Sequence, residues 1–157
     1  MNIDQILRRL GQEIGLPALQ LDETHLCTLR FDGKDIIVIE TSPDGQYVYL
    51  YSMLFTIPSS SKMAFYERLL TANLFGKETG MASFSCNPKT SEVFLTRTLS
   101  LDGLAYEQFA LALEELLQCM EYWREQYEQG QLLSGTDQRQ TSPPKKRDQH
   151  PLDSRFV

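Results

Sequence analysis

The sequence predicts an α+β fold in which the elements follow the order α-β-β-β-α-β-β-α with a twisted antiparallel sheet. Two observations predict this class. Apolar residues recur at three- and four-residue steps in three separate segments, which is the spacing of amphipathic helices. Between those segments, shorter runs alternate with a two-residue period and are joined by turn-forming pairs such as Asp32-Gly33, which is typical of antiparallel hairpins.

The first predicted helix covers about residues 3–14. Asn2 can accept a backbone N–H bond at its start, and Gly15 and Pro17 favour its end. Three strands follow, of which the first begins near Thr24. Alternation predicts that one face of this strand carries His25, Cys27, Leu29 and Phe31.

The next two strands are more apolar. The β-branched run Ile36–Ile39 predicts a strand that is covered on both faces. Over residues 47–55, aromatic residues alternate with aliphatic ones, so neither face is polar. Two interpretations stay open: both faces are buried, or one of them binds a partner through Tyr47, Tyr49 and Tyr51.

The central segment, residues 66–80, connects these strands to a second hairpin that is predicted over residues 81–86 and 92–99. Gly76 is suited to a left-handed helix stop because it has no Cβ, and Gly80 gives a second flexible point. Helical spacing predicts one shared face for Tyr66, Leu69, Leu70 and Leu74.

The last helix has the strongest pattern in the chain. Asp102 is predicted to cap it, and apolar residues keep helical spacing up to about Glu128. After Gly130 the residues are mostly Gln, Ser, Thr, Pro and Lys, and few of them could anchor to a core. We therefore expect one domain, residues 1–128, and a disordered tail, residues 129–157.

Charge is distributed unevenly over the 157 residues. The net charge is −6, the tail from residue 129 onward carries +2, and the body carries the remaining −8. Such an acidic body repels nucleic acid and anionic membranes and favours a basic partner. The tail run Lys145-Lys146-Arg147 could contact an acidic partner or lipid head groups, or serve only to solubilise the tail.

Cysteine usage and hydropathy indicate a cytoplasmic protein. Three cysteines without close spacing do not form a disulfide framework and fit a reducing compartment. Asp4, Arg8 and Arg9 interrupt the N-terminal apolar residues, so a signal peptide is not expected. Apolar runs do not approach the roughly 20 residues that cross a bilayer, so we expect no membrane insertion.

The sequence offers little chemistry. His25 and Cys27 are two residues apart, so an enzyme with a thiolate–imidazole pair is an alternative, but free cysteine is more often a small buried hydrophobe. The same pair gives only two metal ligands, whereas zinc requires three or four. We therefore predict no catalytic residue, no metal site and no cofactor.

The body, from Met1 to about Glu128, resembles the class I type III secretion chaperones, the Tir-chaperone-like or CesT family. The resemblance is carried by the run L-L-T-A-N-L-F-G at residues 69–76, the Gly80 exit, the hairpin 81–99 followed by Ser100-Leu101-Asp102, and the terminal helix with Trp123. Two features depart from the family pattern. The family often has paired glycines where this chain has Gly80-Met81, and the 29-residue tail exceeds the usual length.

The resemblance implies a bacterial cytoplasmic homodimer that is not an enzyme. It would bind the non-globular N-terminal segment of one or more secreted effectors and keep it soluble and export-competent, with the export-machinery ATPase as a further partner. The implied dimer interface is Leu69, Leu70, Leu74, Phe75, Met81 and Phe84. The implied effector-binding residues are Ile6, Leu10, Leu29, Ile37 and Val48. The alternative is a cytoplasmic protein-interaction module with the same fold that is not tied to secretion.

Overall fold

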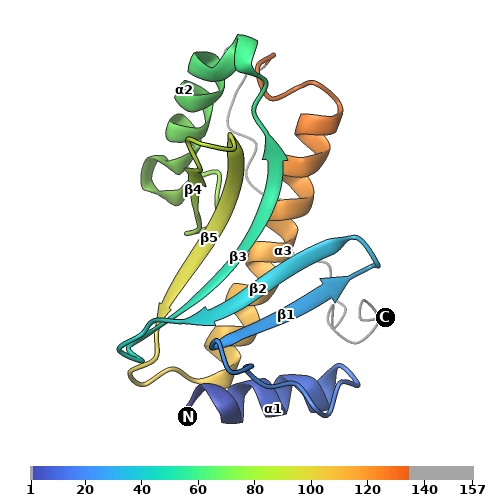
Figure 1. Cartoon of the computed structure of the whole chain (residues 1–157), viewed down its shortest axis with the longest axis vertical. Coiled ribbons are helices and arrows are strands. Elements are labelled where there is room, and N and C mark those ends of the chain that lie inside the picture. Colours follow the sequence, from blue (N-terminus) through green and yellow to red (C-terminus); the bar gives the residue numbers. More distant parts are fainter. Residues whose placement is uncertain (1, 135–157) are drawn as a thin grey trace. The chain divides into compact units, whose positions relative to one another are not determined.

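The computed structural model describes residues 2–134, and Figure 1 shows their elements. The expected disorder of the tail therefore lies outside the described residues from position 135 onward. The elements follow the predicted order, with a short 3₁₀ turn on either side of the central helix. They are α1 (Ile3–Glu13), β1 (Leu26–Phe31), β2 (Asp35–Thr41), β3 (Tyr47–Thr56), η1 (Ser59–Ser61), α2 (Lys62–Asn73), η2 (Leu74–Gly76), β4 (Ser83–Cys86), β5 (Glu92–Ser100) and α3 (Tyr106–Glu128).

Over residues 2–134 the strands form a five-stranded sheet with the order β1-β2-β3-β5-β4. The pairs β1/β2, β2/β3 and β4/β5 are antiparallel, which confirms the α+β class predicted from the sequence. Strands β1 and β4 are the two edges of this sheet. An edge strand carries one row of main-chain groups that the sheet itself does not pair.

The chain divides into two compact units. Unit 1 contains the described residues of Met1–Tyr51 and Arg97–Glu114, and unit 2 contains those of Ser52–Thr96 and Glu115–Arg147. Strands β3 and β5 and helix α3 each begin in one unit and end in the other. Each unit has its own set of buried apolar side chains.

In unit 1, α1 begins with a capping box. The Asn2 side chain accepts the Gln5 backbone N–H at 2.9 Å, and the Gln5 side chain accepts the Asn2 N–H at 3.1 Å, which confirms the predicted cap. The core of this unit comes from α1, from one side of strands β1–β3 and from the first half of α3. It includes Ile6, Leu7, Leu10, Leu29, Phe31, Ile37, Ile39, Val48, Leu50, Phe109 and Leu113.

A polar cluster joins α1 to the start of α3 inside unit 1. The Arg9 guanidinium lies 4.0 Å from the centre of the Tyr106 ring and 2.9 Å from a Glu107 carboxylate oxygen. The buried Tyr106 hydroxyl donates to Glu13, and burial together with this bond raises the pKa of Tyr106 well above its ordinary value. The hydroxyl therefore stays a donor at any physiological pH. Because Arg9 and Glu107 are exposed, their ion pair contributes less to stability than the burial of the Tyr106 ring does.

In unit 2, the fully buried Trp123 lies at the centre of the core. Its indole N–H donates to the Glu78 carbonyl oxygen at 3.1 Å, and its ring meets Phe84 edge-on with centroids 4.8 Å apart. The Arg68 guanidinium lies 4.7 Å from the centre of the same ring and also pairs with the Glu78 carboxylate at 2.7 Å. Trp123 thus ties the second half of α3 to the loop that follows α2.

Two predictions about the strands of unit 1 are wrong. His25 precedes β1 and has a φ of 63°, so it does not continue the face of Cys27. Strand β2 is covered on one face only, because Ile37 and Ile39 are buried while Ile36 is 37% exposed. Both errors arise because alternation gives the period of a strand but neither its first residue nor the number of layers that cover it.

The two ends of α3 also differ from expectation. The helix begins at Tyr106, and the Ala105 N–H donates to the Gln108 side chain, so Asp102 does not cap it. Beyond the helix, residues 129–134 are described, and Leu132 is buried in unit 2. The sequence did not indicate this anchor.

Gly11 is a packing constraint in unit 1. A Cβ at this position would lie 2.3 Å from the Leu16 carbonyl oxygen and 2.9 Å from the Leu19 Cβ. We predict that Gly11→Ala lowers the free energy of unfolding by about 1–3 kcal/mol, because the backbone of the following loop must move. Urea denaturation measures the change. The neighbouring exposed substitution Gln12→Ala is the control and should stay within about 0.5 kcal/mol; equal effects of both would contradict the packing argument.

Candidate protein-interaction surfaces

Helix α2 turns one side into unit 2. Phe65, Leu69 and Ala72 lie at i, i+4 and i+7 and are buried. Leu69 is only 4% exposed. The side formed by these three residues anchors the helix.

The opposite side of α2 is apolar but exposed. Met63, Leu70 and Leu74 are spaced by seven and four residues, and their exposed fractions are 79%, 70% and 55%. The predicted single face that joined Leu70 to Leu69 is therefore wrong, because consecutive helical residues point about 100° apart. Large apolar side chains gathered on one exposed helix side usually mark a contact surface.

The loop after α2 adds two more exposed apolar side chains. Phe75 and Met81 are 81% and 71% exposed, and both have left-handed backbones, with φ of 56° and 70°. This conformation costs a non-glycine residue roughly 1–2 kcal/mol. The predicted left-handed stop at Gly76 is confirmed by its φ of 65°, and a Cβ there would lie 3.4 Å from the Met81 sulfur. Met81 therefore covers Gly76 beside Phe75.

Polar contacts hold this loop in place. The Asn73 side chain accepts the Phe84 N–H at 2.7 Å and donates to the Phe84 carbonyl oxygen at 3.1 Å. The buried Thr79 hydroxyl donates to the Ala82 carbonyl oxygen at 2.6 Å. The loop thus presents its apolar side chains from a fixed backbone.

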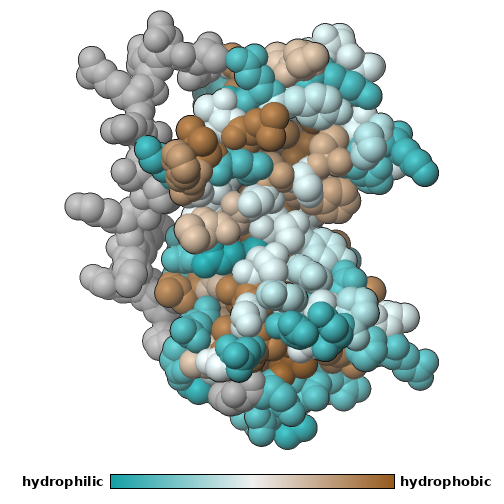
Figure 2. Space-filling model, turned by 90° about the vertical axis from the view of Figure 1, so that its left-hand side faces the viewer, coloured by the Kyte–Doolittle hydropathy of each residue, from teal (hydrophilic) through white to brown (hydrophobic). Residues whose placement is uncertain are grey.

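We call these five exposed residues the α2 patch. In Figure 2, hydrophobic side chains gather over the part of the molecule that contains α2 and the following loop. The α2 patch consists of Met63, Leu70, Leu74, Phe75 and Met81.

Unit 1 has a second apolar surface on the outer side of its strands. Tyr51 pairs with Val38 and Tyr49 with Glu40, which places their side chains on the face opposite the core. Tyr47 is 42% exposed, and Tyr49 and Tyr51 are half-buried. The interpretation in which one face of this strand stays open is therefore the one that the structure supports. We call this surface the tyrosine face; it consists of Ile36, Val38, Tyr47, Tyr49 and Tyr51.

One hydrogen bond orders the tyrosine face. The Tyr51 hydroxyl donates to the Glu40 carboxylate at 2.8 Å. Burial and this bond raise the pKa of Tyr51 to about 12, so the hydroxyl stays protonated at physiological pH. The face is thus amphipathic, with ring surfaces open to a partner and one donor already used.

The two sheet edges differ in how they are protected. At β4, the Asn73 amide occupies both the N–H and the carbonyl oxygen of Phe84, the groups that an added strand would use. At the outer side of β1, the N–H and the carbonyl oxygen of Leu26 both bond to Asp22. Main-chain groups alternate between the two sides of a strand, so those of Thr28 and Arg30 face the same edge as Leu26. Within residues 2–134, β1 is therefore the edge that is open to an incoming strand at Thr28 and Arg30.

The structure does not support the thiolate–imidazole alternative. Cys27 is buried, and burial raises the pKa of its thiol, which is the opposite of what a nucleophile requires. His25 lies in the turn before β1. Among residues 2–134 there is no group of three or more side chains able to hold a metal ion, and no helix there is long and apolar enough to cross a membrane.

A model of the Tir chaperone protein (CesT) family matches residues 5–124. The chain belongs to this family. The match confirms the resemblance found in the sequence. It covers all five strands, α2 and most of α1 and α3, and it leaves out only the first residues of α1 and the last residues of α3. No individually curated protein sequence matches this Tir chaperone family member significantly.

Several solved structures share this fold. The ExsC–ExsE complex has a TM-score of 0.66 and 21% identity and covers 80% of this chain and 96% of the other. The HopA1–SchA chaperone–effector complex has a TM-score of 0.63 and 14% identity, covering 77% and 91%. The Yersinia pestis type III secretion chaperone SycH, in complex with a YscM2 fragment, has a TM-score of 0.59 and 16% identity, covering 76% and 97%. At these identities the similarity establishes the fold alone.

The residues expected at a dimer interface fall into two groups in this Tir chaperone family member. Leu70, Leu74, Phe75 and Met81 are exposed and lie together in the α2 patch. Leu69 and Phe84 are 4% and 8% exposed, so they support the patch from the core of unit 2. Their role in an interface stays a prediction.

The residues expected to bind an effector are all buried in unit 1. Ile6, Leu10, Ile37 and Val48 are fully buried, and Leu29 is 1% exposed. Their side chains hold α1 and strands β1–β3 together. The tyrosine face lies on the other side of these strands, because its residues are the sequence neighbours of Ile37 and Val48 and adjacent strand residues point to opposite faces. Any direct role of the five residues in binding stays a prediction.

Two features of the candidate surfaces were not predicted from the sequence, namely Met63 in the α2 patch and the Asn73 contact that closes β4. Met63 lies seven residues before Leu70, and this spacing could have placed it on the same helix side. The sealing of β4 by Asn73 had no sequence signal, because it joins residues 11 positions apart through a loop of unpredictable shape.

We predict that Asn73→Ala removes the seal on β4 and leaves the Phe84 N–H without its partner. The free energy of unfolding should fall by about 1–3 kcal/mol. Hydrogen exchange at the Phe84 amide should become faster in the same variant, and both changes can be measured on one preparation. Ser85→Ala, an exposed neighbour on the same strand, is the control. An unchanged Phe84 amide in Asn73→Ala would show that the seal is not formed.

Proposed function

We propose that this Tir chaperone family member is a cytoplasmic, non-enzymatic type III secretion chaperone that acts as a homodimer. It binds the non-globular N-terminal segment of one or more effectors and keeps that segment soluble and export-competent. The observation that carries the proposal is the α2 patch, five large apolar side chains exposed on a fixed backbone. Family membership and the tyrosine face of unit 1 support it.

The α2 patch is proposed to contact the same patch of a second copy. A two-fold contact brings identical surfaces together, so each exposed side chain is used twice. Fully burying a large apolar side chain contributes about 1.5–3 kcal/mol. Ten such side chains in a dimer can offset an association cost of roughly 4–15 kcal/mol.

The client segment is proposed to lie along unit 1. An extended peptide can add to the open β1 edge through the main-chain groups of Thr28 and Arg30. Side chains on one side of such a strand would reach the tyrosine face. Main-chain bonds make this recognition tolerant of sequence, which suits a protein with one or more clients.

Binding alone accounts for the activity. Ordering a disordered segment costs roughly 2–5 kcal/mol or more of the contact energy, so the net affinity stays within reach of a machine that removes the client. The acidic body additionally favours a basic client segment. ATP is not needed for any of these steps.

We predict that Leu70→Asp converts the dimer to a folded monomer. Leu70 is 70% exposed in the single chain, so the charge is tolerated there but would be buried and unpaired in the dimer. Sedimentation velocity should show the loss of dimer, with an unchanged circular dichroism spectrum.

Two matched variants define the outcome. Leu69→Asp places the same charge one residue away in the core of unit 2 and should unfold the chain. Leu111→Asp changes an exposed leucine of α3 and should leave the dimer intact. A Leu70→Asp protein that remains dimeric would place the interface elsewhere.

We predict that Arg30→Pro reduces client affinity at least tenfold. Proline removes the N–H that faces the open β1 edge, which the chain's own sheet does not use. Titration with a fluorescent peptide that copies the N-terminal segment of a co-purifying secreted effector measures the affinity. Arg30→Ala removes the same side chain but keeps the N–H, and it should retain affinity. Equal affinities of the two variants would exclude strand addition at β1.

A further inference from the structure

The loop after α2 contains two tight turns, residues 74–77 and 79–82, both within unit 2. In each turn the N–H of the last residue donates to the carbonyl oxygen of the first, at 3.4 Å in the first turn and 3.0 Å in the second. The two central residues have φ of 56° and 65° in the first turn and 57° and 70° in the second. Two consecutive positive φ angles are typical of a type I′ turn. The central pairs are Phe75-Gly76 and Gly80-Met81.

The residue types in these turns do not all fit the backbone. A type I′ turn favours glycine, asparagine or aspartate at both central positions, because a Cβ is strained at positive φ. Each turn has a glycine at one central position only, and the other position holds Phe75 or Met81. For a bulky residue, positive φ is an outlier that needs an explanation.

Other left-handed residues in the described chain follow the usual preference. Among residues 2–134, three further non-glycine residues have positive φ, and all three are polar: His25, Asp32 and Ser91. The two apolar ones, Phe75 and Met81, both belong to the α2 patch and are 81% and 71% exposed. Large side chains at strained positions are thus found only in the patch within this part of the chain.

The single chain does not need either side chain to shape the loop. The second turn is closed by the Thr79 hydroxyl, which donates to the Ala82 carbonyl oxygen at 2.6 Å, and the Gly80 N–H donates to the Gly76 carbonyl oxygen at 3.1 Å. A Cβ at Gly76 would lie 3.2 and 3.3 Å from the nitrogen and Cα of Met81. These are main-chain atoms, so a glycine at position 81 would keep the same close approach.

We propose that Phe75 and Met81 determine the affinity of the dimer and that the single chain is less stable because it carries them. The inference rests on the proposed homodimer and adds which side chains of the α2 patch the second copy requires. Each side chain is buried against apolar surface of the second copy and is used twice. Strain stored at a functional position is thereby offset on association. Replacing either residue with glycine therefore changes stability and association in opposite directions.

Sedimentation velocity of Met81 variants measures association. Met81→Ala and Met81→Gly both remove the thioether, and each should raise the Kd of the dimer roughly tenfold or more, because the contact is lost twice. Phe75→Gly should act in the same way. Met81→Leu keeps an apolar side chain of similar volume and should restore dimerisation. Met53→Ala changes an exposed methionine outside the patch and should leave the Kd unchanged.

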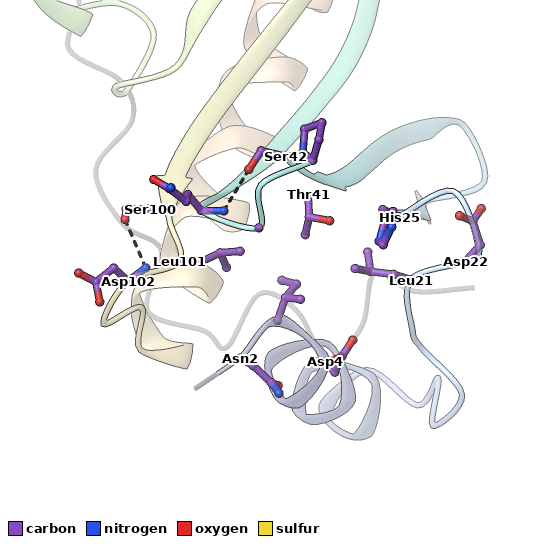
Figure 3. Close-up of a pocket in the computed structure, with 14 residues that line it drawn as sticks. Asn2, Asp4, Leu21, Asp22, His25, Thr41, Ser42, Ser100, Leu101 and Asp102 are labelled. Atoms are coloured by element: carbon purple, nitrogen blue, oxygen red, sulfur yellow. Dashed lines mark hydrogen bonds between the residues drawn. The ribbon is translucent and has the colours of Figure 1, made fainter.

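Urea denaturation at concentrations below the Kd of the dimer measures the strain in the single chain. Met81→Gly should lower the equilibrium constant for unfolding several-fold relative to Met81→Ala, because only glycine adopts this φ without a Cβ penalty. His25→Gly is the control for a left-handed residue outside the patch, with φ of 63°. Figure 3 shows His25 beside Leu21 and Asp22 at a cavity of unit 1, and its substitution should leave the Kd unchanged.

Weaker association together with a more stable single chain in Met81→Gly supports the inference. A normal Kd in Met81→Ala and Met81→Gly, or a Met81→Gly chain that is no more stable than Met81→Ala, would overturn it and leave the homodimer in place. A Met81→Ala protein that dimerises normally but loses affinity for an effector peptide would also overturn it, by assigning the side chain to the client. A wild-type chain that is monomeric would contradict the proposed dimer itself and this inference with it.

Discussion

The two hydrogen bonds between the Asn73 amide and the Phe84 main chain fix how the loop after α2 leaves the helix. They hold the end of α2 against β4, and the backbone between them must turn within ten residues. The turn uses left-handed conformations at Phe75 and Met81, which cost roughly 1–2 kcal/mol each. Trp123 and Thr79 supply further bonds that hold the loop from inside unit 2. The loop therefore exposes its apolar side chains from a rigid backbone. Because the backbone is already ordered, less conformational entropy is lost when the loop associates with a partner.

The same Asn73 contact makes the two sheet edges differ in their access to an added strand. It closes β4 to strand addition and leaves β1 as the open edge. A chaperone with two open edges could add clients or other copies at both, and uncontrolled edge pairing is a route to aggregation. One side-chain amide thus protects the unit that carries the proposed dimer surface, while the unit that carries the tyrosine face keeps an accessible edge.

Much of the fold could be predicted from the sequence because it depends on local patterns. Helical and two-residue periods gave the element order, Asn2 gave the α1 cap, and Gly76 gave the left-handed stop. The residues that carry the proposed function were harder to place. Leu69 and Leu70 look equivalent in sequence, and only the packing of α2 decides that one is buried and the other is exposed.

The expected effector-binding residues show the same limit. Ile37 and Val48 are apolar strand residues, and apolar character alone favours the core face as strongly as a binding face. Tyr47, Tyr49 and Tyr51 indicated the open surface better than the aliphatic residues did, because a tyrosine side chain has a polar hydroxyl and tolerates partial exposure. The Asn73 seal joins two segments that are 11 positions apart in the chain, so no local sequence pattern predicted it.

The central claim is that two copies of this chain hold one client segment. The most direct test is the native mass of the complex formed when the chain is co-expressed with a secreted effector from its own cell. The account predicts a mass equal to two 18.0 kDa chains plus one client. A stable complex that contains a single copy of the chain, or a chain that is monomeric both with and without the client, would contradict it.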